Sequence, residues 1–439
     1  MKKFMRKPFG QLIMAGLLLL CPAARAQRVV SISQLFDLVE QGSQQLRASK
    51  TSEEAATLGL SAARSQRLPD ISTSLSFSYV GNALMTNRHL GDVHGLKSPH
   101  FGNNFALEAQ QTVYAGGAIN AGIRKAQIAS DQAQASTHLT REDQRFIALG
   151  QYLELEKTDH RMEVVRQNIS LTLDIISQIK EKQQQGVALK NDVTRYELQL
   201  QTLNLNLKQL QDQRKILNHQ LCTTLSISPE VEIKPTDEAE QAVFGHESED
   251  FWQQSAATSS PRLRLSQLDA AQAKEDERLA RADLMPKVAL VAADHFDGPI
   301  TYELPPIDKN INAWYVGVGV SYPVSSLFKS NKRLRQARVL TQQKQEQTIV
   351  TSQQLDNDMQ QAHTLYEQAY VELQTQQKKV QLAQENYQVM NDRYLNQLAL
   401  VTDMVDASNL KLDAELQEVD ARISIAFAYY RMKYIAGTL

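Results

Sequence analysis

The stretch ISTSLSFSYV, residues 71–80, has a two-residue period that decides how the whole chain is interpreted. Its apolar residues fall on one parity and its serines on the other: Ile71, Leu75, Phe77 and Tyr79 against Ser72, Ser74, Ser76 and Ser78. Successive side chains of a β-strand point to opposite faces, so the stretch predicts a strand with one apolar and one polar face. The strand is unexpected because most of the chain has a helical composition.

The first residues of the chain have the pattern of a secretory signal peptide. A basic start precedes an apolar run at 12–21, and a small-x-small cleavage pattern ends at Ala26. We therefore expect residues 1–26 to be a signal peptide; lipidation of Cys21 is the alternative, disfavoured by the bulky residue before it. Removal of 1–26 takes away five basic residues and no acid, which leaves a formal charge of −7. An acidic exported chain argues against nucleic acid as a partner.

Long parts of the chain lack helix breakers. No glycine or proline occurs between Val324 and Ala436, and this tract is rich in good helix formers. From Val193 to Leu221 apolar residues recur at alternating steps of three and four, with Arg214 at the one position that is not apolar. This spacing predicts coiled-coil packing of long helices.

The chain also repeats itself. Arg67-Leu68-Pro69 aligns with Leu284-Met285-Pro286, and Ala188-Leu189-x-x-Asp192-Val193 aligns with Ala399-Leu400-x-x-Asp403-Met404. We expect two tandem repeats, each with a helix, two strands and a coiled-coil hairpin. Their bounds are 27–225, with strands at about 70–81 and 104–114, and 253–439, with strands at about 287–297 and 313–324. Residues 226–252 form the connector between them.

The four expected strands share the alternation of polar and apolar residues. Phe105 shares a parity with Val113, and Trp314 and Tyr322 bracket one apolar face. In the third strand Asp294 falls on the apolar parity, which a bulge or a strand end near it would explain. Such segments with long polar loops are typical of transmembrane β-strands, and a soluble sheet packed on helices is the alternative. The expected membrane girdle is Phe77, Tyr79, Phe105, Trp314 and Tyr322.

Four strands cannot close a barrel alone. Their two open edges would leave backbone groups unpaired in lipid, and about eight strands are the smallest workable barrel. Two copies would give eight strands and a nearly plugged lumen, and three would give twelve with a wide lumen. A wide bundle of long helices favours three copies.

The order of these features resembles the TolC-like outer membrane efflux family over essentially the whole mature chain. The resemblance is carried by the entry segment 31–35, the Pro69 and Pro286 junctions, the run from Gly186 to Val193, and Tyr394 followed by Asp403-x-x-Asp406-Ala407. It implies a mainly α fold with a small β part. Antiparallel hairpins form an α-barrel in the periplasm, and four transmembrane strands per chain contribute to a trimeric 12-stranded β-barrel in the outer membrane, with the connector in an equatorial region.

The resemblance implies a passive exit duct of a tripartite efflux or secretion system for small molecules such as drugs and toxic compounds. The implied partners are two further copies in a homotrimer, a periplasmic adaptor protein, an inner-membrane transporter and the outer membrane lipids. The turns at 186–192 and 397–403 resemble the tips where adaptors dock: Gly186, Val187, Ala188, Leu189, Leu398, Ala399 and Leu400. Asp192, Tyr394, Asp403 and Asp406 resemble residues of the pore constriction.

Asp403 and Asp406, three residues apart, share a helix face, and threefold symmetry would turn them into two carboxylate rings that favour cations. Acids at a helix start also stabilise the helix, which is the alternative. Two departures from the family pattern bear on the tips. Ala399 replaces a frequent arginine and Gln397 replaces a glycine, so we expect different closing bonds, with Arg393 or Lys190 as candidates.

The sequence contains no motif of a known enzyme class, and we expect no catalytic activity, cofactor or metal site. His89, His94 and His100 share a loop but fit no standard ligand spacing. The alternative function is an exported periplasmic coiled-coil adaptor or scaffold protein. Such a protein would have one hairpin instead of two matched halves.

Overall fold

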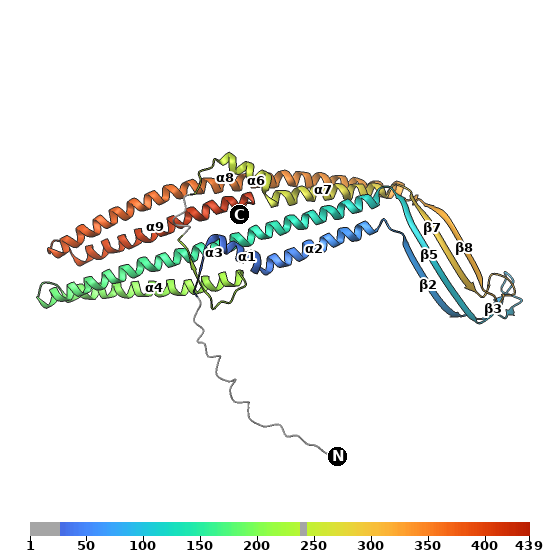
Figure 1. Cartoon of the computed structure of the whole chain (residues 1–439), viewed down its shortest axis with the longest axis horizontal. Helices are drawn as coiled ribbons and strands as arrows, with labels where there is room; N and C mark the ends of the chain where they lie inside the picture. Colours follow the sequence, from blue (N-terminus) through green and yellow to red (C-terminus); the bar gives the residue numbers. More distant parts are fainter. Residues whose placement is uncertain (1–26, 238–243) are drawn as a thin grey trace, which may run out of the picture. The chain divides into compact units, whose positions relative to one another are not determined.

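The structure, a computed structural model, describes residues 27–237 and 244–439. The predicted signal peptide, including Cys21, lies outside these residues. The described chain is mainly helical with a smaller strand part, as the sequence predicts (Figure 1). Within the two described ranges, no helix has both the length and the apolar character needed to cross a bilayer.

The chain forms two compact units, and each unit draws on both sequence repeats. Unit 1 contains the described parts of 1–47, 140–258 and 357–439; unit 2 contains 48–139 and 259–356. Two long helices, α3 (Ala118–Gln184) and α8 (Ser326–Leu395), contribute residues to both.

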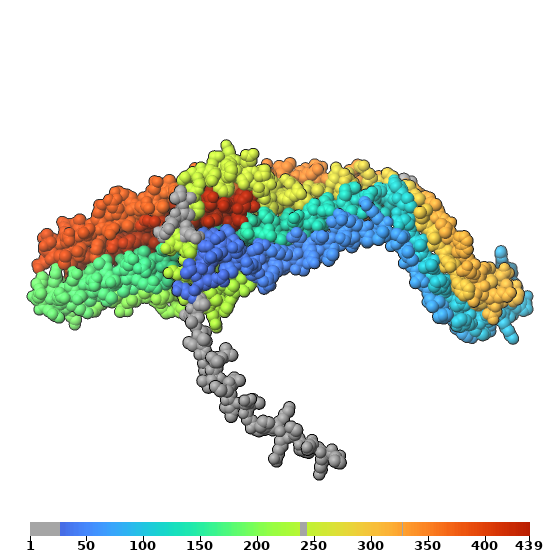
Figure 2. Space-filling view, in the orientation of Figure 1, coloured from blue at the N-terminus to red at the C-terminus, as the bar shows by residue number. Residues whose placement is uncertain are grey.

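Unit 1 contains two helical hairpins. The C-terminal part of α3 turns into α4 (Lys190–Thr224), and that of α8 turns into α9 (Val401–Ala436). Figure 2 shows the first hairpin, in green, lying along the second, in orange and red, as far as the tips of both. Two hairpins in one chain is the arrangement expected of two repeats.

The entry segment of unit 1 is fixed by a capping box. Ser31 caps α1 (Ile32–Gly42): its hydroxyl accepts from the Gln34 N–H at 3.3 Å, and the Gln34 side chain accepts from the Ser31 N–H at 3.1 Å. The preceding strand β1 (Gln27–Val30) pairs in parallel with β6 (Glu232–Pro235) of the connector. The connector also contains the start of α6 (Glu249–Ser259).

Arg214 explains the interruption of the apolar heptad in α4. Its guanidinium donates to Asp159 on α3 at 2.5 Å, to Glu232 at 2.7 Å and to the Ile233 carbonyl at 3.1 Å. The arginine therefore fastens the connector strand to the first hairpin, a task that no apolar side chain could perform.

Polar contacts join the helices of unit 2. They are α2 (Gln44–Ser65), α7 (Pro261–Ala282) and the first parts of α3 and α8. Arg124 donates to Glu275 at 2.9 Å and Lys125 to Asp276 at 2.6 Å, which join α3 to α7. The Thr341 hydroxyl donates to the Ala273 carbonyl at 3.1 Å and joins α8 to α7.

The remainder of unit 2 is an antiparallel sheet in the order β2-β5-β7-β8 (Figure 1). The strands are β2 (Asp70–Tyr79), β5 (Phe101–Ala115), β7 (Lys287–Gly298) and β8 (Ile311–Ser321). A small hairpin of β3 (Ala83–Met85) and β4 (His94–Leu96) lies in the loop between β2 and β5. Among the described residues, β2 and β8 each have one edge without a strand partner.

We expect Arg214→Met to destabilise the connector of unit 1 by about 2 kcal/mol, because it leaves the carboxylates of Asp159 and Glu232 without their cation. The check is hydrogen exchange of the β6 amides at 232–235, which should become faster. Lys215→Met is the matched control, since the neighbouring Lys215 side chain is 71% exposed. Equal effects of the two substitutions would contradict the anchoring role of Arg214.

Candidate functional site

The two tip turns have the same backbone geometry, 211 residues apart. In the first, Gly186 has φ +78° and the Val187 N–H donates to the Lys182 carbonyl at 2.9 Å. In the second, Gln397 has φ +63° and the Leu398 N–H donates to the Arg393 carbonyl at 2.8 Å. The second turn therefore forms without glycine by placing a glutamine in the left-handed region, which costs conformational energy.

Asp192 and Asp403 also occupy equivalent positions, in the first turns of α4 and α9. The Leu189 N–H donates to the Asp192 carboxylate at 3.2 Å, and the Leu400 N–H donates to the Asp403 carboxylate at 3.0 Å. Each aspartate thus stabilises the start of its helix, whatever further role it has. Asp406 is exposed one turn along α9 and takes no part in this capping.

Tyr394 and Asp192 come together across the two hairpins. Burial, and after it the Asp192 carboxylate, raises the pKa of Tyr394, so the phenol stays protonated at neutral pH. Lys182 lies beside them: its Nζ donates to the Leu395 carbonyl at 3.2 Å and is 5.7 Å from the centroid of the Tyr394 ring. Lys182 therefore links the end of α3 to the end of α8.

Lys182 was not singled out by the sequence patterns, which pointed to Arg393 or Lys190. The signal that could have found it is the repeat itself, because Lys182 is the equivalent of Arg393 at the offset of 211 residues. The pore role of Asp192, Tyr394, Asp403 and Asp406 concerns other copies of the chain and stays a prediction.

The outer surface of the two tips is apolar. Leu189, Leu398 and Leu400 have exposed fractions of 70%, 74% and 70%, and Val187 of 48%. Gly186 is exposed as well, whereas Ala188 and Ala399 are half-buried. Large apolar side chains grouped at an exposed turn are typical of a protein interaction surface.

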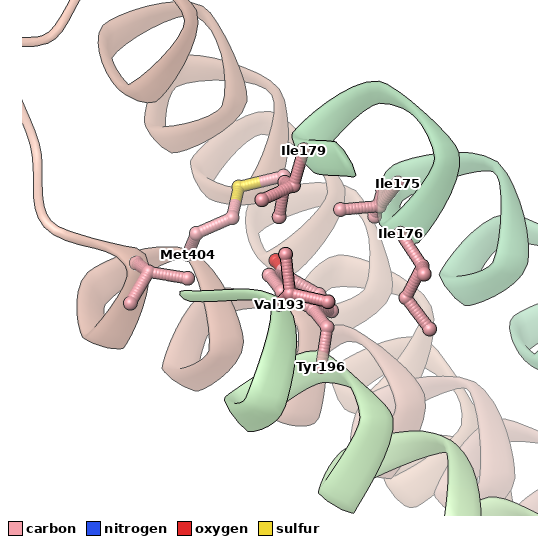
Figure 3. Packing of buried hydrophobic residues seen from close by; sticks show 7 residues of the cluster. Ile175, Ile176, Ile179, Val193, Tyr196 and Met404 are labelled. Atoms are coloured by element: carbon pink, nitrogen blue, oxygen red, sulfur yellow. The ribbon is translucent and has the colours of Figure 1, made fainter. Parts of the chain in front are cut away.

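Behind this surface the two hairpins share an apolar core, the tip core. It consists of seven buried residues: Ile175, Ile176, Ile179, Val193, Tyr196, Val401 and Met404. Figure 3 shows Met404 of the second hairpin reaching toward Ile179 and Val193 of the first. Tyr387, Met390 and Tyr394 of α8 pack against it, half-buried.

In unit 2 the strand register collects the apolar side chains on one face of the sheet. Four of the five predicted girdle residues lie on this face; the fifth, Tyr322, follows the end of β8. Its members are Ile71, Leu75, Phe77 and Tyr79; Phe101, Phe105 and Leu107; Leu290 and Phe296; and Trp314, Val316, Val318 and Val320. The sequence patterns missed Phe101 and Phe296.

The opposite face of the sheet is mainly polar on β2 and β5. It carries the four serines of β2 together with Asn104, Glu108, His295 and Asp297. Asn104 donates to Asp297, and the His295 Nε2 is 3.8 Å from the Glu108 carboxylate. The two faces of the sheet therefore suit two different solvents.

Two details of the sheet differ from the sequence patterns. β7 runs through Asp294 with neither a bulge nor an end, so this aspartate stays on the apolar face opposite Trp314, where the Asn312 amide donates to it at 2.6 Å. The bulge lies instead in β5 between Thr112 and Tyr114, so Tyr114 and not Val113 continues the face, opposite Val288.

The apolar face has an oblique outer boundary. Its last large apolar residue is Tyr79 on β2 but Trp314 on β8, and the register aligns Trp314 with Thr73, six residues before Tyr79. The boundary thus shifts by about 20 Å along the strands over about 14 Å across them. Such a slope is expected when strands are tilted strongly from the normal of the layer that they cross.

The loop histidines do not gather around a common point. His100 stacks on Tyr79 with centroids 5.0 Å apart and contacts the Val80 carbonyl at 2.8 Å, whereas His94 is paired with Asp92 at 3.1 Å. Among the described residues, no group of three or more His, Cys, Asp or Glu side chains is arranged to hold a metal ion.

The tip turns can be tested by exchanging their central residues. We expect Gly186→Gln to lower the local free energy of opening of the first turn by about 1 kcal/mol, because a side chain is strained at this positive φ. Gln397→Gly should be neutral or stabilise the second turn by less than about 1 kcal/mol, since glycine relieves strain but adds freedom to the unfolded chain. Hydrogen exchange at 185–189 and 396–400 measures both effects; equal destabilisation by both would contradict the shared geometry.

Comparison with known proteins gives this geometry a context. Residues 252–438 match the sequence profile of the family described as outer membrane efflux protein. A comparison with curated protein sequences found no match.

Solved structures similar to the chain include the outer-membrane channel OprN, with TM-score 0.80, 18% identity, and 93% of this chain and 90% of that chain covered. VceC from Vibrio cholerae has TM-score 0.76 and 16% identity, with 92% and 96% covered. CmeC from Campylobacter jejuni has TM-score 0.74 and 14% identity, with 93% and 85% covered.

The family description agrees with the predicted location in the outer membrane. The structures show that the fold is that of TolC-like outer membrane channels over nearly the whole chain. The second repeat is therefore similar to the outer membrane efflux protein family, and the fold of the chain is that of TolC-like channels.

Proposed function

We propose that this protein is the outer membrane exit duct of a tripartite efflux or secretion system, in which it lets small molecules leave the cell passively. The family match supports a general role in efflux. The single observation that supports a duct is the sheet. It has one apolar face, one polar face and two edges that have no strand partner among the described residues.

The open edges require further copies of the chain if the sheet lies in a membrane. Unpaired N–H and C=O groups are not tolerated in lipid, so β2 of one copy must pair with β8 of the next. Three copies close twelve strands around a lumen wide enough for solutes. The apolar face then meets lipid, the serine face meets water, and the oblique boundary reflects the tilt of the barrel strands.

The residues of the hairpin tips suit two further functions of a duct. The exposed residues Val187, Leu189, Leu398 and Leu400 suit the docking of a periplasmic adaptor, which would connect the duct to an inner-membrane transporter. Asp406 and Asp403 share an exposed face of α9, and three copies would bring six carboxylates to the entrance. The cargo depends on the transporter.

Cell fractionation with chemical crosslinking tests the proposal most directly. We expect the protein in the outer membrane fraction, crosslinked into a trimer, and we expect it to conduct ions in planar bilayers. Recovery as a periplasmic monomer would reject both the barrel and the trimer, and would favour the scaffold alternative.

The assignment of the sheet faces predicts opposite effects at adjacent residues of β8. Val316→Arg should prevent accumulation in the outer membrane, because an arginine facing lipid near mid-bilayer costs about 2–4 kcal/mol in each copy. Tyr315→Arg, on the lumen face, should insert normally. The measurement is the amount of crosslinked trimer in the outer membrane; equal loss for both would show that the faces are assigned wrongly.

The tip aspartates predict the ion preference of the entrance. Asp403→Ala with Asp406→Ala should weaken the block of bilayer conductance by polyvalent cations at least tenfold, because both carboxylate rings are lost. Asp413→Ala, farther along α9, is the control and should retain the block. Unchanged block in the double variant would mean that these aspartates do not face the lumen.

A further inference from the structure

The tip core contains a polar atom that its surroundings leave unpaired. Tyr152, Tyr196 and Tyr366 are among the largest fully buried side chains of the described protein. The Tyr152 hydroxyl bonds to the Val30 carbonyl at 2.8 Å, and that of Tyr366 to the Gly245 carbonyl at 2.9 Å. The hydroxyl of Tyr196, which is 0% exposed, has no hydrogen-bond partner among the described residues.

The position of Tyr196 makes this hydroxyl sensitive to how the two hairpins are packed. The side chain comes from α4 of the first hairpin and belongs to the same core as Met404 of the second (Figure 3). Val401 of the second hairpin is a further member of this core. If the hairpins part at the tips, the core opens and water can reach the hydroxyl. The unpaired state therefore belongs to the packed arrangement alone.

The Tyr196 hydroxyl does not ionise at neutral pH, so it stays a neutral buried group without a hydrogen-bond partner. Burial, with the neighbouring Tyr387 and Tyr394 as smaller causes, raises the pKa of Tyr196 far above neutrality. A neutral hydroxyl that is buried without a partner loses its hydrogen bonds to water and gains nothing in return. Phenylalanine would fill the same volume without this penalty.

From these observations we infer that the unpaired hydroxyl of Tyr196 destabilises the packed tip core. It lowers the free energy needed to separate the two hairpins and so sets how easily the duct opens. The inference rests on the proposed duct function and names a regulating residue for it. Lys182 stabilises the packed hairpins instead, because its bond to the Leu395 carbonyl joins them at the edge of the tip core.

The test compares the full-length protein with Tyr196→Phe in two assays. We expect the open fraction of single channels in planar bilayers to fall by about 5- to 150-fold, the range that corresponds to removing one unsatisfied buried hydroxyl. Hydrogen exchange of the tip amides at 186–193 and 398–404 should slow by a similar factor. Lys182→Met should change both readouts in the opposite direction, which shows that the assays detect loosening.

Tyr366→Phe is the matched control, because it removes a buried tyrosine hydroxyl that is already bonded. It should not slow exchange at the tips. Unchanged or faster exchange in Tyr196→Phe would overturn the inference, since it would show that the hydroxyl is bonded in the packed state. Absence of channels from the unmodified protein would reject the proposed function instead, and the exchange measurement would still decide the role of Tyr196.

Discussion

The structure depends on the pairing of backbone groups at the two edges of one sheet. Within the described chain, β2 and β8 end the strand order, and neither has a partner on its outer side. The same strands carry one apolar and one polar face. The sheet alone can therefore neither pair the backbone groups of its edges nor shield its apolar side chains from water. The closure by further copies that we propose would satisfy both requirements at once.

The alternation of polar and apolar residues was enough to predict the strands, because it is a local property of each segment. Ile71 and Tyr79, or Trp314 and Val320, need no knowledge of their neighbours to be placed on one face. The bulge at Val113 and the oblique boundary could not be predicted this way. Both depend on the register between strands separated by many residues along the chain, which is fixed by pairing and not by composition.

At the tips, too, some features follow from local sequence patterns and others depend on contacts between distant residues. The repeated motif around Asp192 and Asp403 predicted two equivalent turns, and the turns share their backbone bonds. The contact of Lys182 with Leu395 joins residues 213 positions apart, so no local pattern contains it. The capping bonds of Asp192 and Asp403 also show that an aspartate can stabilise the start of its helix while it stays at least partly exposed to solvent. Asp406 has no capping bond and does not stabilise the start of α9 in this way.

The composition of the two compact units has a consequence for how the protein is made. Unit 1 needs residues from 357 onward, and unit 2 needs residues 259–356, so neither unit is complete when only the first repeat has been synthesised. During export, more than half of the chain must cross the inner membrane before either unit can finish folding. Its amphipathic strands and helices stay exposed to aggregation over that interval. The order of the segments along the chain therefore lengthens the interval in which the unfolded chain is exposed.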